Sequence, residues 1–309
     1  MVRPGTQPVL GRPRQGDRRG PDSRATGAAP IRGRSRVVTT GRIFYDGTLT
    51  QPRLDHPECV AVHPHDGSVW CGGEAGQIFR ITPDGDRLNV VASTGGFVLG
   101  ICFDPTAQHL YACDLAHRAL FQMEIETGRL RRFAKGIPER PFLIPNYPAV
   151  DPAGRVYVSD SNAPGKPGPG VYRFTPDGAG DLWYDGPLDF ANGLALAPDG
   201  SDLYVVESFL PGISRIPIRH DGSAGEKQPV VELPDTVPDG LAFGPDSHLY
   251  IGLYEPSKVL RMNSRRQVET VLDDRTAHLL AHPTNLAFRD DQLFTSNLGR
   301  WHITLIEAL

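Results

Sequence analysis

The sequence has no long hydrophobic run, because none of its 309 residues belongs to a stretch approaching 18 consecutive apolar residues. A helix of about that length is needed to cross a bilayer. The first 36 residues also lack the apolar core of a secretory signal peptide. We therefore expect no membrane partner and a cytoplasmic location.

Cysteine and tryptophan are scarce as well. The four cysteines are Cys59, Cys71, Cys102 and Cys113. They form no C-x-x-C pair, so a zinc or redox motif is not indicated, and we expect reduced, buried thiols. The three tryptophans include no Trp-Asp dipeptide, which excludes the WD40 class of repeats.

The N-terminal segment has little negative charge and no aromatic residue. Residues 1–36 contain nine arginines and only two acids, Asp17 and Asp22, a net charge of +7. Without aromatic side chains to stack on bases, the segment is weak evidence for nucleic-acid binding. We expect a disordered basic tail over 1–36 and no nucleic-acid partner; a nucleic-acid arm or a targeting peptide are the alternatives.

Glycine and proline, by contrast, are abundant, at 34 and 29 residues, and much of this excess recurs at regular intervals. Six similar segments each consist of an apolar run, a turn of the Pro-Asp-Gly or Pro-x-Gly kind, and a second apolar run. They begin at Glu58, Leu99, Asn146, Asn192, Asp239 and Thr284. The spacing between successive segments is 41 to 47 residues. Each segment predicts a β-hairpin, because proline and glycine favour the turn and branched or aromatic residues favour the strands.

Two further strand candidates follow most of these hairpins, for example at 76–85 and 88–93. Four short antiparallel strands in 41 to 47 residues are typical of a β-propeller blade. We therefore predict an all-β, six-bladed propeller with four-stranded antiparallel blades over residues 37–309. The last repeat has only three strand candidates, so 36–45 is expected to supply its outer strand and close the ring. A pair of β-sandwiches is the competing fold.

The first residue of each segment should project from an innermost strand toward the common axis. Four of these six residues carry oxygen ligands: Glu58, Asn146, Asn192 and Asp239. Because none is histidine or cysteine, the set suits Ca²⁺, which takes six to eight oxygens, better than Zn²⁺. We predict one divalent cation here, Ca²⁺ first, with Zn²⁺, Mg²⁺ or Mn²⁺ as alternatives. The competing interpretation is that Asn192-Gly193 and Asp239-Gly240 are turns, although each is followed by a separate turn of its own repeat.

The segments 145–161, 190–208 and 237–252 resemble the SMP-30/gluconolactonase/luciferin-regenerating family of six-bladed propellers. The resemblance implies a single divalent metal, usually Ca²⁺, held by Glu58, Asn146, Asn192 and Asp239. It also implies hydrolysis of a sugar lactone. The sequence departs from the family pattern at Ile144, where the family has an arginine that helps to grip sugar hydroxyls. This departure puts gluconolactone in doubt and suggests a less polar substrate.

These observations predict a metal-dependent hydrolase of an ester bond, with a small-molecule substrate and no obligate protein partner. Asp239 is the expected catalytic residue, accepting a proton from the attacking water. Tyr147, His282 and Thr284 are candidate substrate contacts. Asp160, Glu207 and Asn297 are candidates to support the ligands or to form turns. The absence of a G-x-S-x-G motif argues against serine-based catalysis.

Two alternatives stay open at this point. One is a non-hydrolytic propeller, either strictosidine-synthase-like or a ligand-binding scaffold. The other is a hydrolase of the organophosphate type.

Overall fold

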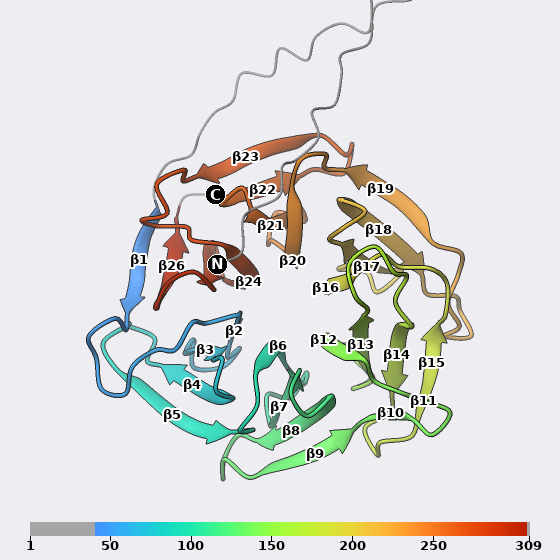
Figure 1. The fold of residues 1–309 in the computed structure, drawn as a ribbon, viewed down its shortest axis with the longest axis horizontal. Coiled ribbons are helices and arrows are strands. Elements are labelled where there is room, and N and C mark those ends of the chain that lie inside the picture. The colour runs from blue at the N-terminus through green and yellow to red at the C-terminus, as the bar shows by residue number, and fades with distance from the viewer. Residues whose placement is uncertain (1–40, 308–309) are drawn as a thin grey trace, which may run out of the picture. The chain divides into compact units, whose positions relative to one another are not determined.

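The computed structural model describes residues 41–307, and the predicted tail over 1–36 lies outside this range. Within it, every regular element is a β-strand. The strands form six four-stranded antiparallel sheets around a common axis, together with one two-stranded ribbon (Figure 1). The prediction of an all-β, six-bladed propeller with four-stranded blades is confirmed. No helix that could span a membrane occurs in the described part of the chain.

The blades follow one another in chain order, and the first strand named in each is the innermost. Blade 1 contains β2 (Cys59–Val62), β3 (Val69–Gly72), β4 (Gln77–Ile81) and β5 (Leu88–Ser93). Blade 2 contains β6 (Val98–Phe103), β7 (His109–Asp114), β8 (Ala119–Glu124) and β9 (Leu130–Ala134). Blade 3 contains β12 (Ile144–Val150), β13 (Val156–Ser161), β14 (Gly170–Phe174) and β15 (Gly180–Tyr184).

The second half of the ring repeats the pattern. Blade 4 contains β16 (Ala191–Leu196), β17 (Asp202–Glu207), β18 (Gly212–Pro217) and β19 (Gln228–Glu232). Blade 5 contains β20 (Val237–Phe243), β21 (Leu249–Glu255), β22 (Lys258–Met262) and β23 (Val268–Asp273). Blade 6 contains β24 (Pro283–Arg289), β25 (Gln292–Asn297), β26 (His302–Ile306) and β1 (Gly41–Asp46).

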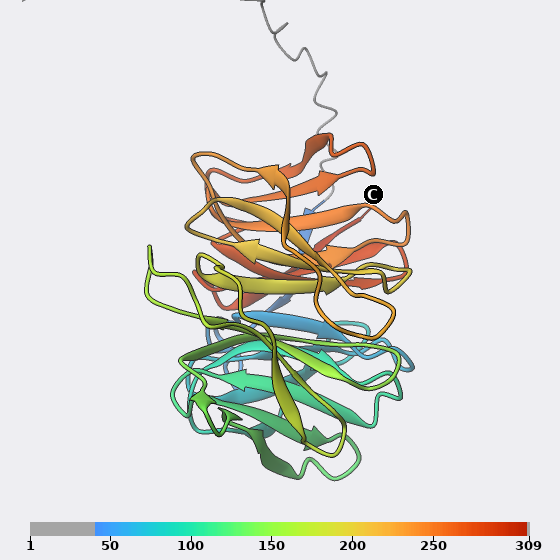
Figure 2. The same ribbon diagram turned by 90° about the vertical axis from the view of Figure 1, so that its right-hand side faces the viewer.

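The innermost strand of each blade contacts the innermost strands of both neighbouring blades, so six strands surround the axis. The strands run across the side view, roughly along the axis (Figure 2). The hairpin turns behave as their composition predicts. In blade 4, Gly200 has a φ of +72°, and Asp199 accepts a hydrogen bond at 3.0 Å from the backbone N–H of Ser201. Glycine adopts this left-handed conformation without a Cβ clash, which explains its place in the turn.

The ring closes through β1, which pairs antiparallel with β26 as the outer strand of blade 6. This confirms the predicted closure, although the described strand begins at Gly41. Phe44 of β1 is buried and meets the ring of Phe294 edge-on, with the centroids 4.9 Å apart. The two rings belong to a core cluster that also contains side chains of blade 1. The closing strand is therefore fixed by packing as well as by its ladder of hydrogen bonds.

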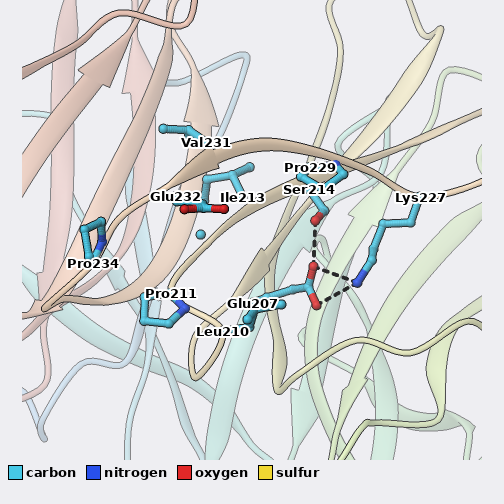
Figure 3. A pocket seen from close by; sticks show the side chains of 11 residues that line it. Glu207, Leu210, Pro211, Ile213, Ser214, Lys227, Pro229, Val231, Glu232 and Pro234 are labelled. Atoms are coloured by element: carbon cyan, nitrogen blue, oxygen red, sulfur yellow. Dashed lines mark hydrogen bonds and ion pairs between the residues drawn. The ribbon is translucent and has the colours of Figure 1, made fainter. Parts of the chain in front are cut away.

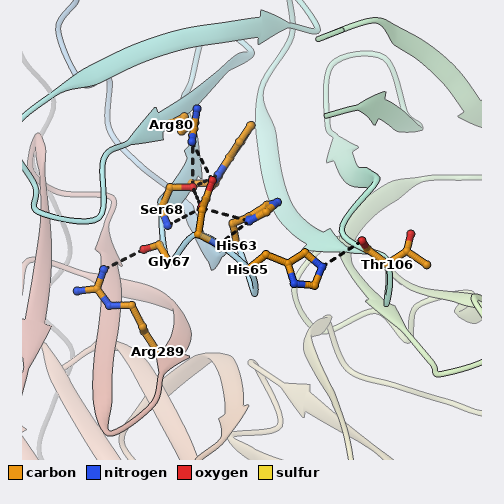
Figure 4. A network of polar contacts seen from close by, with 9 residues as sticks. His63, His65, Gly67, Ser68, Arg80, Thr106 and Arg289 are labelled. Carbon is orange, nitrogen blue, oxygen red and sulfur yellow. Dashed lines mark hydrogen bonds and ion pairs between the residues drawn. The ribbon is translucent and has the colours of Figure 1, made fainter. Parts of the chain in front are cut away.

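Blade 1 is also tied to both neighbours at the turn of its first hairpin (Figure 4). Arg289 of blade 6 donates from Nη1 to the Gly67 carbonyl at 2.8 Å. On the other side, the His65 ring lies 3.4 Å from the carbonyl of Thr106 in blade 2. In each of these contacts a side chain of one blade reaches a turn carbonyl of the neighbouring blade.

Two smaller features complete the ring. The ribbon of β10 (Gly136–Ile137) and β11 (Arg140–Pro141) was not predicted, because two-residue strands leave no detectable alternation of apolar and polar residues. All four cysteines are free; three of them are buried and Cys102 is half-buried.

Closure through β1 yields a stability prediction. Phe44→Ala should lower the free energy of unfolding by about 3 kcal/mol, because it removes a buried ring that joins the closing strand to blades 1 and 6. The neighbouring Ile43, which is 37% exposed, is the matched control, and Ile43→Ala should cost less than about 1 kcal/mol. Urea unfolding followed by tryptophan fluorescence measures both. Equal losses in the two variants would contradict the role given to Phe44.

Candidate active site

The innermost strands share an irregularity near their first residues. In blades 2 to 6 the pairing between the innermost and the second strand shifts register at this point. The residues inside these bulges include Leu99, Asn146, Asn192, Asp239 and Thr284, and Glu58 stands directly before β2. A bulge leaves its residues out of the regular ladder and turns their side chains away from the normal alternation. Five of the six positions singled out in the repeat therefore lie in equivalent bulges, whereas the first hairpin, which follows Glu58, pairs without one.

The glycines that follow two of these residues explain the Asn-Gly and Asp-Gly pairs. A Cβ on Gly193 would lie 2.6 Å from the carbonyl oxygen of Asp239, and one on Gly240 would overlap the carbonyl of Thr284. Neither glycine has the positive φ of a turn. Glycine is needed here because the backbone of the next blade approaches closely. The two pairs are thus part of the blade junctions and not turns.

Five of the six residues singled out in the repeat, all but Thr284, line a cavity of about 370 Å³. Its lining includes all four oxygen-bearing side chains predicted from the repeat: Glu58, Asn146, Asn192 and Asp239. All four are buried. The structure therefore brings the predicted cation ligands together, from blades 1, 3, 4 and 5, at one end of the axis.

Two of these side chains carry buried carboxylate oxygens without a hydrogen-bond partner, Oε2 of Glu58 and Oδ1 of Asp239. Burial raises the pKa of Glu58 well above its ordinary value, and the nearby Asp239 raises it further. Burial likewise raises the pKa of Asp239 to about 7, although a hydrogen bond from Asn192 offsets part of the rise. Among the described residues, no lysine, arginine or histidine lines the cavity. The donor set fits a divalent cation with oxygen ligands, which would give the buried carboxylates their missing partner.

Two serines that were not singled out in the sequence fix the amide groups of the site. Asn146 donates from Nδ2 to Oγ of Ser161 at 3.2 Å, and Asn192 donates in the same way to Ser208 at 3.2 Å. Each serine in turn donates to a carbonyl of the next blade, that of Ala191 or that of Pro238. With Nδ2 engaged, the Oδ1 atom of each amide is left for a ligand. The sequence did contain a signal for these two serines. An acidic residue followed by serine ends the second strand in two blades, as Asp160-Ser161 and Glu207-Ser208.

The residues expected to support the site hold the segments that enter the innermost strands. Asp160 accepts hydrogen bonds from the backbone N–H groups of Leu143, at 2.9 Å, and Ile144, at 2.7 Å. Burial raises the pKa of Asp160 to about 7, and these two donors offset part of the rise. In blade 6, Asn297 accepts from the N–H of Ala281 at 2.9 Å.

Glu207 holds the corresponding segment in blade 4, and both of its carboxylate oxygens accept hydrogen bonds. Its carboxylate accepts hydrogen bonds from the backbone N–H of Asp189 at 3.0 Å, from Ser214 at 2.6 Å and from Lys227 at 3.0 Å. Figure 3 shows the pairing with Ser214 and Lys227 in a second cavity of about 330 Å³. Glu207 thereby anchors the segment that leads to Asn192.

The three predicted substrate contacts lie beside the cavity and do not line it. Tyr147 is buried between blades, with its ring against Gly100. Thr284 donates from its hydroxyl to the carbonyl of Glu58. His282 stacks on Tyr254, with the ring centroids 4.5 Å apart, and its Nδ1 lies 3.1 Å from Oε1 of Glu255. Each of the three therefore supports a residue near the site, and direct contact with a substrate stays a prediction.

The sequence profile of the SMP-30/gluconolactonase/LRE-like region matches residues 56–296. The chain belongs to this family. The match spans all the cavity-lining residues described above, from Glu58 to Glu255. No curated protein matches the sequence.

Solved structures of similar fold include members of the same family. A gluconolactonase from Xanthomonas campestris superposes with a TM-score of 0.71 at 20% identity, over 86% of this chain and 88% of its own. A luciferin-regenerating enzyme gives 0.66 at 15% identity, over 82% and 91%. A virginiamycin B lyase from Staphylococcus aureus gives 0.60 at 17% identity, over 82% and 80%. At these identities the likeness concerns the fold.

The unpaired carboxylates predict a stabilising substitution. In EDTA, Glu58→Gln should raise the free energy of unfolding by about 1 to 2 kcal/mol, because it removes a buried charge next to Asp239. The exposed Glu74, whose charge also acts on Glu58, supplies the control. Glu74→Gln should change the free energy of unfolding by less than about 0.5 kcal/mol.

The gain should also depend on pH. A carboxyl whose pKa is raised by folding contributes stability below its ordinary value of 4.5 and loses that contribution as the pH rises toward the folded value. The difference between Glu58→Gln and wild type should therefore widen from about pH 5 to about pH 8. Thermal melts across this range test it, and a gap that narrows with pH would contradict the assignment.

Proposed function

We propose that the protein is a divalent-cation-dependent hydrolase, with Ca²⁺ as the preferred ion, that opens a lactone or a related ester. The observation that carries this proposal is the pair of buried, unpartnered oxygens of Glu58 and Asp239 beside two amides in one cavity. Membership of the SMP-30/gluconolactonase/LRE-like family supports it. A propeller that served only as a scaffold would gain nothing from this destabilising arrangement.

The four oxygen-bearing side chains would hold the cation. Glu58 and Asp239 balance its charge, and Asn146 and Asn192 add neutral ligands whose orientation Ser161 and Ser208 fix. When bound, the cation supplies a Lewis acid that polarises the ester carbonyl and lowers the pKa of a coordinated water.

Asp239 is the residue we assign to proton transfer. Its Oδ1 is buried at the cavity and accepts no hydrogen bond from the protein, so one lone pair of this oxygen could ligate the cation and the other could accept a proton of the attacking water. The Asn192 amide, bonded to both Ser208 and Asp239, keeps the carboxylate in place. The buried floor of the cavity limits competing solvent and strengthens these electrostatic interactions.

The proposal predicts hydrolysis that depends on the cation and on Asp239. With Ca²⁺, acid release from a panel of lactones should be enzymatic, and EDTA should abolish it. Asp239→Asn should lower kcat by at least about 100-fold, because the asparagine cannot accept the proton. Asp199→Asn, in the exposed turn of the same ring, is the control and should retain the wild-type rate. Hydrolysis that persists in EDTA or in Asp239→Asn would sink the mechanism.

The serine contacts predict a separate effect on cation affinity. Ser208→Ala should weaken Ca²⁺ binding by about 10- to 100-fold, because Asn192 loses the partner that orients its amide. Ser201, which is exposed in the turn of blade 4, provides the matched control, and Ser201→Ala should bind Ca²⁺ normally. Isothermal titration calorimetry measures both constants. An unchanged affinity in Ser208→Ala would show that the serine does not position the ligand.

A further inference from the structure

The walls of the cavity differ in chemistry from its floor. Besides the four oxygen-bearing residues, six apolar side chains from blades 2 to 5 line the cavity: Leu99, Leu115, Ile144, Phe190, Phe209 and Val237. The only other polar groups in the lining, apart from Ser208, are Tyr254 and Glu255. Because Ser208 already bonds Asn192 and the carbonyl of Pro238, it is engaged within the protein.

This lining offers little to a polar substrate. Among the described residues that line the cavity, no basic side chain is present to pair with a phosphate or carboxylate group. Asn192 donates to Ser208 and to Asp239, and Asn146 donates to Ser161. The Tyr254 hydroxyl and the second N–H of Asn146 are therefore the side-chain donors left for substrate hydroxyl groups. A polyhydroxylated substrate would press several of its hydroxyls against the apolar walls without partners, which is costly in a desolvated site.

Two phenylalanines form the part of the wall nearest to solvent. Phe190 and Phe209 meet edge-on, with centroids 5.0 Å apart and an interplanar angle of 85°. Phe190 has a φ of +55°, which is strained for a bulky side chain and persists only where the surroundings enforce it. Glu207 supplies such a restraint through its bond to the N–H of Asp189. The aromatic pair is therefore held in place, and Phe209 is 43% exposed.

Ile144, the first residue of β12 in blade 3, supplies another part of the apolar wall. Its backbone N–H is fixed by Asp160, and its side chain lines the cavity. The adjoining Leu143 is 39% exposed, so the apolar surface continues outward from the cavity.

We infer that the substrate is an uncharged lactone that carries a hydrocarbon or aromatic substituent, and not a sugar lactone or an anionic ester. This inference rests on the proposed function, because it assumes that the floor of the cavity opens an ester bond. The ring ester lies at the polar floor, and the substituent buries its apolar surface against the walls.

The direct test compares two lactones with the same six-membered ring ester, δ-decalactone and glucono-δ-lactone. After subtraction of the uncatalysed rates, kcat/KM with Ca²⁺ should be about 100-fold higher for δ-decalactone, mostly through a lower KM. A higher kcat/KM for glucono-δ-lactone would overturn the inference and leave the proposed hydrolase standing.

Two variants test whether the preference for δ-decalactone arises from the apolar wall. Ile144→Arg should lower kcat/KM for δ-decalactone about tenfold, because a guanidinium would have to be desolvated beside the alkyl chain. Leu210→Arg, at a residue that is 59% exposed and outside this lining, should leave the rate unchanged. Equal effects in the two variants would overturn the assignment of Ile144 to the substrate-binding wall.

The inference is separable from the proposed reaction. If neither lactone is hydrolysed, the proposed function fails, and binding of two unreactive analogues decides the substrate class. The δ-lactam with the pentyl side chain of δ-decalactone should then bind at least about tenfold more tightly than gluconolactam in calorimetry. Tighter binding of gluconolactam, or no binding of either lactam, would overturn the inference.

Discussion

The close approach of neighbouring blades at their innermost strands is the constraint on which the rest of the structure depends. The backbones of blades 4 and 5 come so near at Gly193 that no side chain fits, and Gly240 makes the same allowance between blades 5 and 6. At these junctions the strands bulge and leave the ladder, which frees Asn192 and Asp239 to face a shared cavity. The close packing of the blades therefore also determines which side chains face the cavity.

The same arrangement lowers the stability of the folded protein at the candidate site. Two carboxylates are buried side by side without basic partners, which raises their pKa values and disfavours the folded state when both are ionised. The surrounding hydrogen bonds compensate locally. Ser161 and Ser208 each join an amide of one blade to a carbonyl of the next, and Glu207 and Asp160 hold the strands' entry segments. The electrostatic destabilisation is concentrated where a cation would be bound, and the hydrogen bonds that hold the backbone in place surround that point.

The fold could be predicted because its signals are local and repeated. Each Pro-Asp-Gly turn between apolar runs predicts a hairpin, and six such units predict the blades. The oxygen-bearing residues that line the cavity could be found from register alone, since Glu58 and Asp239 occupy the same place in their repeats. Ser208 was missed because its role depends on a hydrogen bond to the next blade. Phe209 was missed because it meets Phe190 only once the blade has folded, across the whole length of the first hairpin. Tyr147, a predicted substrate contact, stands where blades 4 and 5 have glycine, and its ring packs in the junction between blades, which the sequence pattern did not indicate.

The same segment of chain sets both the floor and the wall of the cavity. Glu207 fixes Asp189, the next residue Phe190 is forced to a positive φ against Phe209, and two residues later Asn192 reaches the floor. Because these residues share one short, restrained backbone, the apolar wall cannot shift without moving an amide of the floor. The proposed substrate-binding wall and the proposed cation ligand are therefore mechanically linked in blade 4. In blade 3 the link recurs, since Asp160 holds Ile144 at the wall two residues before Asn146.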